Sequence, residues 1–174
     1  MRRRGQRWLL VSTLAAFLVA IAQIALPSQL QIGGARPGIL VVAAMAIGLH
    51  FGAWSGLGWG LLAGLFADML AAHPLGIVGL PVAVVGYLSG RAHALVLDSR
   101  VVIPLAAGLL GTVLSDLLQA LIASLWGYPV LLGHMLLHLT LPAALYNAAL
   151  TLAFFVALLP VHRLQRRSRL TVRI

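Results

Sequence analysis

Two acidic residues, Asp68 and Asp116, stand inside long apolar runs of the sequence. A charged aspartate at the centre of a membrane-spanning helix costs about 2.5–3.5 kcal/mol on insertion scales, so acids at such positions are candidates for a functional role. Asp68 lies close to the end of the run 55–72, where it can accept hydrogen bonds from the chain at 73–76. From the sequence, Asp68 can be either a structural anchor or a functional group, and both roles stay open.

Asp116 lies deeper, near the middle of the run 101–125. Thr112 and Gln119 share its helical face at offsets of four and three residues. Asn147, in the last apolar run, is a candidate partner, because a protonated acid bonded to an amide would hold two helices together without a charge. We therefore expect Thr112, Asp116, Gln119 and Asn147 to form a buried polar group that stabilises helix contacts.

The remaining reactive side chains do not form a catalytic set. His134 and His138 have the i, i+4 spacing of a zinc-binding helix, but Met135 replaces the glutamate that would act as general base. Ser89-Gly90 resembles an intramembrane serine-protease signature only in those two residues, and Tyr87 stands where that signature has glycine. The chain has no lysine for a phosphate-binding loop. We expect no enzyme activity, no metal site and no cofactor.

The composition indicates whether the chain folds in water or in a lipid bilayer. Of 174 residues, 61% are hydrophobic and 9% are charged, whereas a soluble domain carries about 25% charged residues. This composition predicts an all-α integral membrane protein. The net charge is +9, and every cation is arginine. The arginines cluster at the ends of apolar runs, which favours anionic lipid headgroups rather than nucleic acid as their partner.

The chain divides into six apolar runs that form one polytopic membrane domain, 1–174. A spanning helix needs about 20 apolar residues, and we place the helices near 8–26, 37–53, 55–72, 76–92, 101–125 and 135–159. One helix over 37–72 would be about 54 Å long, far longer than the ~30 Å hydrocarbon core. A tight hairpin near 52–56 is therefore required.

Arginine positions orient this bundle. With six spans and cytoplasmic termini, only Arg36 faces outside, as the positive-inside rule requires. The arginines expected at the cytoplasmic surface are Arg2, Arg3, Arg4, Arg7, Arg91, Arg100, Arg163, Arg166, Arg167, Arg169 and Arg173. The basic tail 162–174 can either lie along the lipid headgroups or be surrounded by water, and both alternatives stay open. The prediction is a compact multi-pass membrane bundle with both termini in the cytoplasm.

Glycine recurs at every fourth position from Gly48 to Gly64. In lipid, close backbone approach drives helix association, and small residues permit it. The hairpin assigns Gly48 and Gly52 to the second span, and Gly56, Gly60 and Gly64 to the third. Packing within the bundle is the favoured interpretation, and an interface with a partner helix stays open.

From Gly56 onward the sequence resembles the rod shape-determining protein MreD family, whose pattern is G-F-x-x-G-L-x-x-D, then L-G, then G/A-Y-L. The matching positions are Gly60, Gly64, Leu65, Asp68, Leu75, Gly76, Tyr87 and Leu88. Further matches are Arg36-Pro37, Asp116 and the Leu145-Tyr146-Asn147 element. Gly38 departs from the family, which usually has a polar residue after the proline.

The resemblance implies a non-enzymatic scaffold subunit of the bacterial cell-elongation machinery that helps to regulate peptidoglycan synthesis and rod cell shape. The implied location is the bacterial cytoplasmic (inner) membrane. Its implied partners are an MreC-like bitopic protein, then RodA, a penicillin-binding transpeptidase and MreB, with a homo-oligomer left open. The implied fold is similar to the S components of energy-coupling vitamin transporters. The candidate partner-interface or structural motif is Gly56, Gly60, Gly64, Asp68, Leu75 and Gly76.

A vitamin-binding S component is the alternative function. It would need an outer pocket with several convergent polar and aromatic groups. The outer connections near 27–36, 73–75 and 126–134 are short and sparsely polar, and offer Trp126, Tyr128, His134 and Asp68. A proton- or ion-coupled transporter ranks last, because the chain has no internal repeat symmetry of the kind such transporters use.

Overall fold

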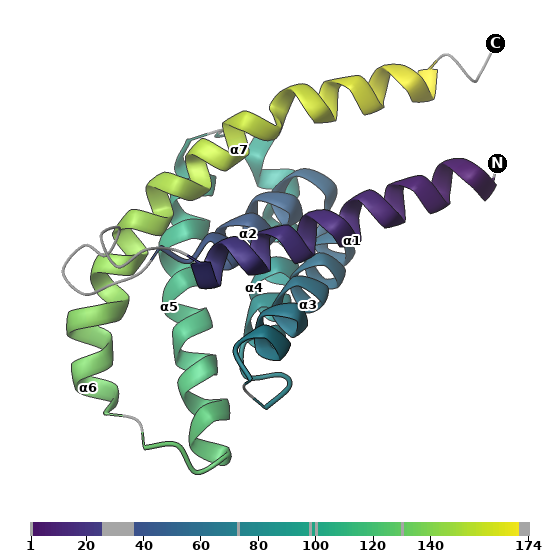
Figure 1. Ribbon diagram of the computed structural model, residues 1–174. Helices are drawn as coiled ribbons and strands as arrows, with labels where there is room; N and C mark the ends of the chain where they lie inside the picture. Colours follow the sequence, from purple (N-terminus) through teal and green to yellow (C-terminus); the bar gives the residue numbers. More distant parts are fainter. Residues whose placement is uncertain are drawn as a thin grey trace.

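The computed structural model describes residues 2–25, 37–72, 74–97, 99, 101–129 and 131–170, and all regular structure in these segments is helical. The elements are α1 (Arg2–Ala25), α2 (Ile39–Phe51), α3 (Ala53–Leu70), α4 (Gly79–Arg91), the 3₁₀ helix η2 (Ala92–Leu97), α5 (Val102–Leu125), α6 (Leu132–His134), the π-helical η3 (Met135–Thr140) and α7 (Leu141–Leu170). Since α6, η3 and α7 follow one another without a break, each predicted run corresponds to one helical stretch (Figure 1). The expected all-helical class is confirmed.

The required break between the second and third runs is a single residue, Gly52. Its φ of 91° lies in the left-handed region, which glycine adopts without the steric cost that a Cβ imposes. Gly52 therefore ends α2 and starts α3 within one residue. The prediction of a tight turn here is confirmed.

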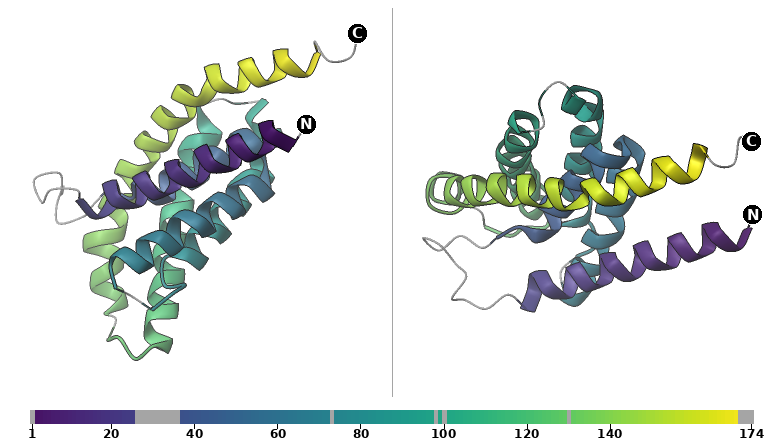
Figure 2. Two further views of the ribbon diagram at one scale, coloured as in Figure 1. Left: turned by 45° about the vertical axis from the view of Figure 1, so that its right-hand side comes forward. Right: turned by 90° about the horizontal axis from the view of Figure 1, so that it is seen from above.

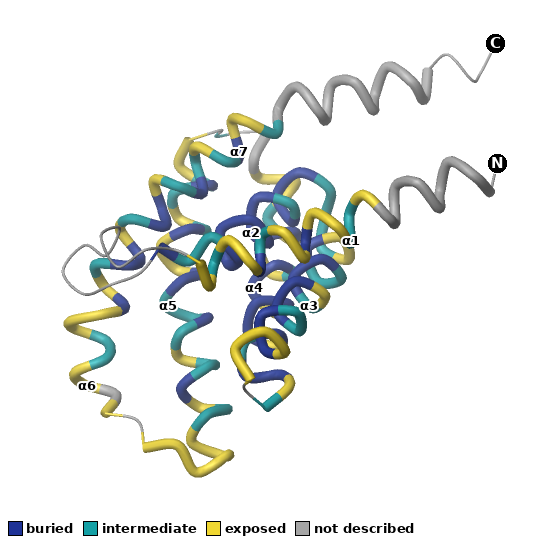
Figure 3. The backbone as a smooth tube through the Cα atoms, viewed as in Figure 1, coloured by how far each residue is buried: buried dark blue, intermediate teal, exposed yellow. Residues whose placement is uncertain are grey.

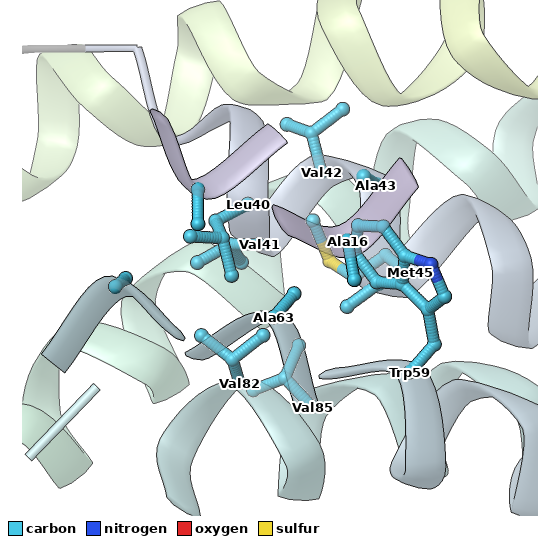
Figure 4. Packing of buried hydrophobic residues seen from close by; sticks show 13 residues of the cluster. Ala16, Leu40, Val41, Val42, Ala43, Met45, Trp59, Ala63, Val82 and Val85 are labelled. Atoms are coloured by element: carbon cyan, nitrogen blue, oxygen red, sulfur yellow. The ribbon is translucent and has the colours of Figure 1, made fainter. Parts of the chain in front are cut away.

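Helix α2 forms the centre of the bundle. It packs against α1, α3, α4, α5 and α7, and Figure 3 shows it buried along most of its length. A helix that is apolar on every side is stable only when neighbours surround it, and α2 reads ILVVAAMAIGLHF. Figure 4 shows Val42 and Met45 of α2 packed with Ala16 of α1, Trp59 of α3 and Val85 of α4.

Helices α5 and α7 pack against each other and extend beyond this core, as Figures 1 and 3 show. Among the described residues, Val102–Leu125 and Met135–Leu158 are long and apolar enough to cross a membrane. The apolar segments Val11–Ala25 and Ile39–Phe51 are shorter. These helices indicate a membrane protein, and the count of six crossings stays a prediction.

The two ends of the helical chain lie near each other. In both views of Figure 2, the first turns of α1 and the last turns of α7 are on the same side of the molecule. This arrangement agrees with an even number of crossings. The cytoplasmic location of the termini stays a prediction.

Candidate functional site

The Asp68 carboxylate connects the end of α3 to the start of α4. Asp68 is completely buried and accepts backbone N–H groups of Gly76 at 2.8 Å, Val78 at 2.9 Å and Gly79 at 3.1 Å. The first N–H groups of a helix have no partner inside the helix, and they carry its positive dipole end. Asp68 therefore caps α4 from a neighbouring helix. The hydrogen bond expected from the 73–76 segment is present, and two further ones follow it.

The turn before α4 is shaped to reach this carboxylate. Gly76 is buried and has a φ of 101°, a conformation that a residue with a Cβ rarely adopts. Its neighbour Leu75 is 57% exposed. The Asp68 hydrogen bond at Gly76 thus holds a turn that presents Leu75 on the surface.

The glycines of α3 form the contact with α4. A Cβ added at Gly56 would lie 2.2 Å from the Gly86 carbonyl oxygen, one at Gly60 would lie 2.8 Å from the Val82 oxygen, and one at Gly64 would lie 2.4 Å from the Gly79 Cα. Only glycine permits this backbone approach. The glycine face is thus used inside the bundle, the interpretation that the sequence favoured. A partner helix would have to displace α4 to reach this glycine face, so the packing does not favour the alternative of a partner interface, which stays a prediction.

A third helix joins the same contact. A Cβ at Gly48 of α2 would lie 2.3 Å from the Gly86 oxygen of α4. The backbones of α2, α3 and α4 therefore converge around Gly48, Gly56 and Gly86. This convergence explains why glycine continues at the same spacing on both sides of the Gly52 turn.

Asn147 of α7 links three parts of the bundle. Its Oδ1 accepts the Gly38 N–H at 2.9 Å, and its Nδ2 donates to Thr112 Oγ1 at 3.2 Å. Thr112 in turn donates to the Gly108 carbonyl at 2.7 Å. Asn147 and Thr112 are both buried. The predicted pairing of Asn147 with Asp116 is wrong, because the amide is already committed to Gly38 and Thr112.

Gly38 is the position at which the chain departs from the MreD-like pattern. A Cβ there would lie 2.8 Å from Asn147 Nδ2. Any larger residue would therefore have to shift the Asn147 amide. The missing side chain at position 38 allows the Gly38 backbone N–H to bond directly to Asn147.

Gln23 of α1 has a structural role that the sequence analysis missed. Its Nε2 donates to the Pro37 carbonyl at 3.0 Å, and its Oε1 accepts the Leu40 N–H at 3.3 Å. Gln23 thus binds both sides of the start of α2. The available signal was a glutamine inside an otherwise apolar run.

Asp116 lines a cavity of about 740 Å³ together with Gln119 and Thr140. Gln119 shares the Asp116 face as predicted from spacing, but its Nε2 donates to Ser115 Oγ at 3.1 Å. The Thr140 hydroxyl lies beside the Asp116 carboxyl without meeting hydrogen-bond geometry. Thr112 and Asn147 line the same cavity, but among the described residues no hydrogen bond joins this pair to Asp116, Gln119 or Thr140.

The other candidate residues are dispersed. The His134 and His138 rings are exposed and 4.8 Å apart, and no group of three or more His, Cys, Asp or Glu that could hold a metal occurs among the residues described. Trp126 and Tyr128 are exposed, and Asp68 is turned to α4, so these residues do not form one pocket. The backbones of Arg2, Arg3, Arg4, Arg7, Arg163, Arg166, Arg167 and Arg169 lie in the first turns of α1 and the last turns of α7.

Comparison with known proteins identifies the family. The family model for the rod shape-determining protein MreD matches residues 2–164. No curated protein and no solved structure matches the chain. The match spans both the Asp68 cap and the Asn147 link, so it covers the whole described core. The chain therefore belongs to the rod shape-determining protein MreD family.

Proposed function

We propose that this protein is a non-catalytic scaffold subunit of the bacterial cell-elongation complex. It binds an MreC-like bitopic protein in the cytoplasmic membrane and through it helps to regulate peptidoglycan synthesis by RodA and a penicillin-binding transpeptidase. The observation that supports this proposal is the family match over residues 2–164. The arginine-rich ends contact anionic lipid headgroups, and MreB acts on the same assembly.

The turn at Leu75 is the surface that we assign to partner binding. Leu75 is 57% exposed, while the residues around it are fixed by the hydrogen bonds from Gly76 and Val78 to Asp68. A rigid apolar side chain loses little conformational entropy on binding, which favours affinity. Asp68 and Gly76 therefore act by holding the turn, and Leu75 makes the contact.

Affinity purification of the tagged full chain from gently solubilised host membranes tests both statements. We expect mass spectrometry to find an MreC-like protein with the wild type and much less with Leu75→Gln. Leu80→Gln is the matched control, because Leu80 is 52% exposed on α4. Equal loss in both variants would contradict the assignment of Leu75. Recovery of an ATPase pair with a coupling subunit, in place of the MreC-like protein, would contradict the scaffold function.

A further inference from the structure

The cavity beside Asp116 has the size and lining of a ligand site. Its volume of about 740 Å³ falls within the roughly 300–1,000 Å³ of small-molecule pockets. It lies among α1, α2, α3, α5 and the η3–α7 stretch, and apolar residues such as Leu40, Ile77, Ala120 and Leu139 supply much of its wall. Its polar lining residues are Gln23, Thr112, Asp116, Gln119, Thr140 and Asn147.

Three of these polar side chains are already bonded to the protein through both a donor and an acceptor. Gln23 uses its amide nitrogen and oxygen on Pro37 and Leu40. Asn147 uses both ends of its amide on Gly38 and Thr112. Thr112 accepts from Asn147 and donates to a carbonyl. The two amide nitrogens each retain one N–H, which is a donor and therefore does not suit an ammonium group.

The other three retain hydrogen-bonding capacity. No cation among the described residues lies beside the Asp116 carboxyl, whose neighbour is the Thr140 side chain. Thr140 is completely buried, and its hydroxyl makes no hydrogen bond within the described chain. Gln119 donates through Nε2 to Ser115, which leaves its Oε1 available. Asp116 and Gln119, three residues apart on α5, are neighbours on one helix face.

These groups are mainly acceptors. A carboxylate, an amide oxygen and a hydroxyl oxygen can each accept a hydrogen bond, and an ammonium group carries three donors and no acceptor. Asp116 is partly buried, and a carboxylate withdrawn from water is stabilised by a paired cation far more than by an apolar neighbour. We propose that this cavity binds an amphiphilic amine, with its ammonium group on Asp116, Gln119 and Thr140 and its apolar body along Leu40 and Leu139. Both a free alkylamine and the ethanolamine headgroup of a lipid carry this chemistry.

Thermal unfolding of the purified full chain in detergent tests the proposal with two probes of the same length. We expect n-octylammonium to raise the unfolding temperature saturably and uncharged n-octanol to raise it much less. Asp116→Asn should weaken octylammonium binding roughly tenfold or more, as for loss of a hydrogen bond to a charged group. Ser124→Ala is the control, because Ser124 is exposed on the same helix and its hydroxyl donates to the Leu121 carbonyl.

Thr140→Val keeps the test decisive if Asp116→Asn does not fold. Valine has the same shape as threonine and removes a buried hydroxyl that makes no hydrogen bond to the described residues. The variant should therefore fold at least as well as the wild type and bind octylammonium more weakly. Equal shifts from octylammonium and octanol, or unchanged octylammonium binding in Thr140→Val, would overturn the proposal. These measurements need no partner protein, so their failure leaves the scaffold function standing.

A lipid-retention experiment identifies the source of the ammonium group. The protein is reconstituted in nanodiscs that contain phosphatidylethanolamine and phosphatidylcholine, and native mass spectrometry follows the retained lipid. Retention of phosphatidylethanolamine by the wild type but not by Asp116→Asn would assign the lipid headgroup. Octylammonium binding without such retention would assign a free amine. Either result supports the site.

Discussion

The Asp68 carboxylate of α3 accepts the Gly79 N–H at the start of α4 over 3.1 Å, so an acid on one helix completes the hydrogen bonding of the next. The same carboxylate oxygen also accepts the Gly76 N–H. Asp68 follows Gly64 by four residues and so ends the glycine series on α3. Its position is explained by the helix end that it satisfies, without any need for catalysis.

Replacing Asp68 with asparagine should destabilise the fold. An amide has one oxygen, whereas three backbone N–H groups converge on the two oxygens of Asp68, so at least one donor would face the new NH₂ group. We expect a loss of about 1–3 kcal/mol in unfolding free energy, measured by denaturant titration in detergent. Asp116→Asn serves as the control and should be tolerated, and a comparable loss there would contradict the distinction between the two acids.

The glycines of α3 should differ sharply in their tolerance of alanine. A Cβ at Gly64 would lie 2.4 Å from the Gly79 Cα, whereas one at Gly58 meets nothing within 4 Å. We expect Gly64→Ala to destabilise the protein by about 1–3 kcal/mol through overpacking. Gly58→Ala should leave it unchanged or stabilise it by up to about 1 kcal/mol through helix propensity. Thermal unfolding of both variants checks this, and equal unfolding temperatures would show that α3 and α4 are not so close.

Asn147→Leu should separate α2 from α7. The Gly38 N–H would lose its acceptor and Thr112 would lose its donor, and an unsatisfied buried group costs about 1–3 kcal/mol. Thr151→Val is the matched control, because the Thr151 hydroxyl donates to a carbonyl of its own helix. Hydrogen exchange at the start of α2 should accelerate in Asn147→Leu alone. Similar exchange in both variants would show that the Asn147 link does not hold α2.

The absence of cysteine from the sequence makes the membrane topology directly measurable. Single cysteines at Arg3, Tyr128 and Arg167 can be labelled with a membrane-impermeant maleimide in intact cells. Six crossings with cytoplasmic termini predict labelling at position 128 only, with positions 3 and 167 labelled after lysis. Labelling of either terminal position in intact cells would disprove that topology.

The helices could be predicted from the sequence because the thickness of the bilayer limits their length. The break at Gly52 follows from the length of an unbroken helix over 37–72. The spacing of Gly56, Gly60 and Gly64 predicts a close helix contact of α3, although it does not identify α4 as the neighbour. The hydrogen bond from Gly76 to Asp68 follows from the short distance along the chain. Each of these inferences concerns residues that are close in sequence.

The remaining contacts depend on how separate helices are rotated about their axes. Helical periodicity places Thr112 and Asp116 on one face of α5, but it does not say which of them faces Asn147 of α7. For the same reason the sequence did not reveal that Gln23 caps α2. The cavity beside Asp116 needs five segments of the chain together, and its lining cannot be read from any one of them.

Depletion of the protein in its native host, with cell length and width measured by microscopy, tests its role in cell elongation. Rod-shaped cells should become wide and round, and the wild-type chain and Gly58→Ala should restore the rod shape while Asp68→Asn restores it poorly. Unchanged cell shape after confirmed depletion would contradict the role of this protein in cell elongation.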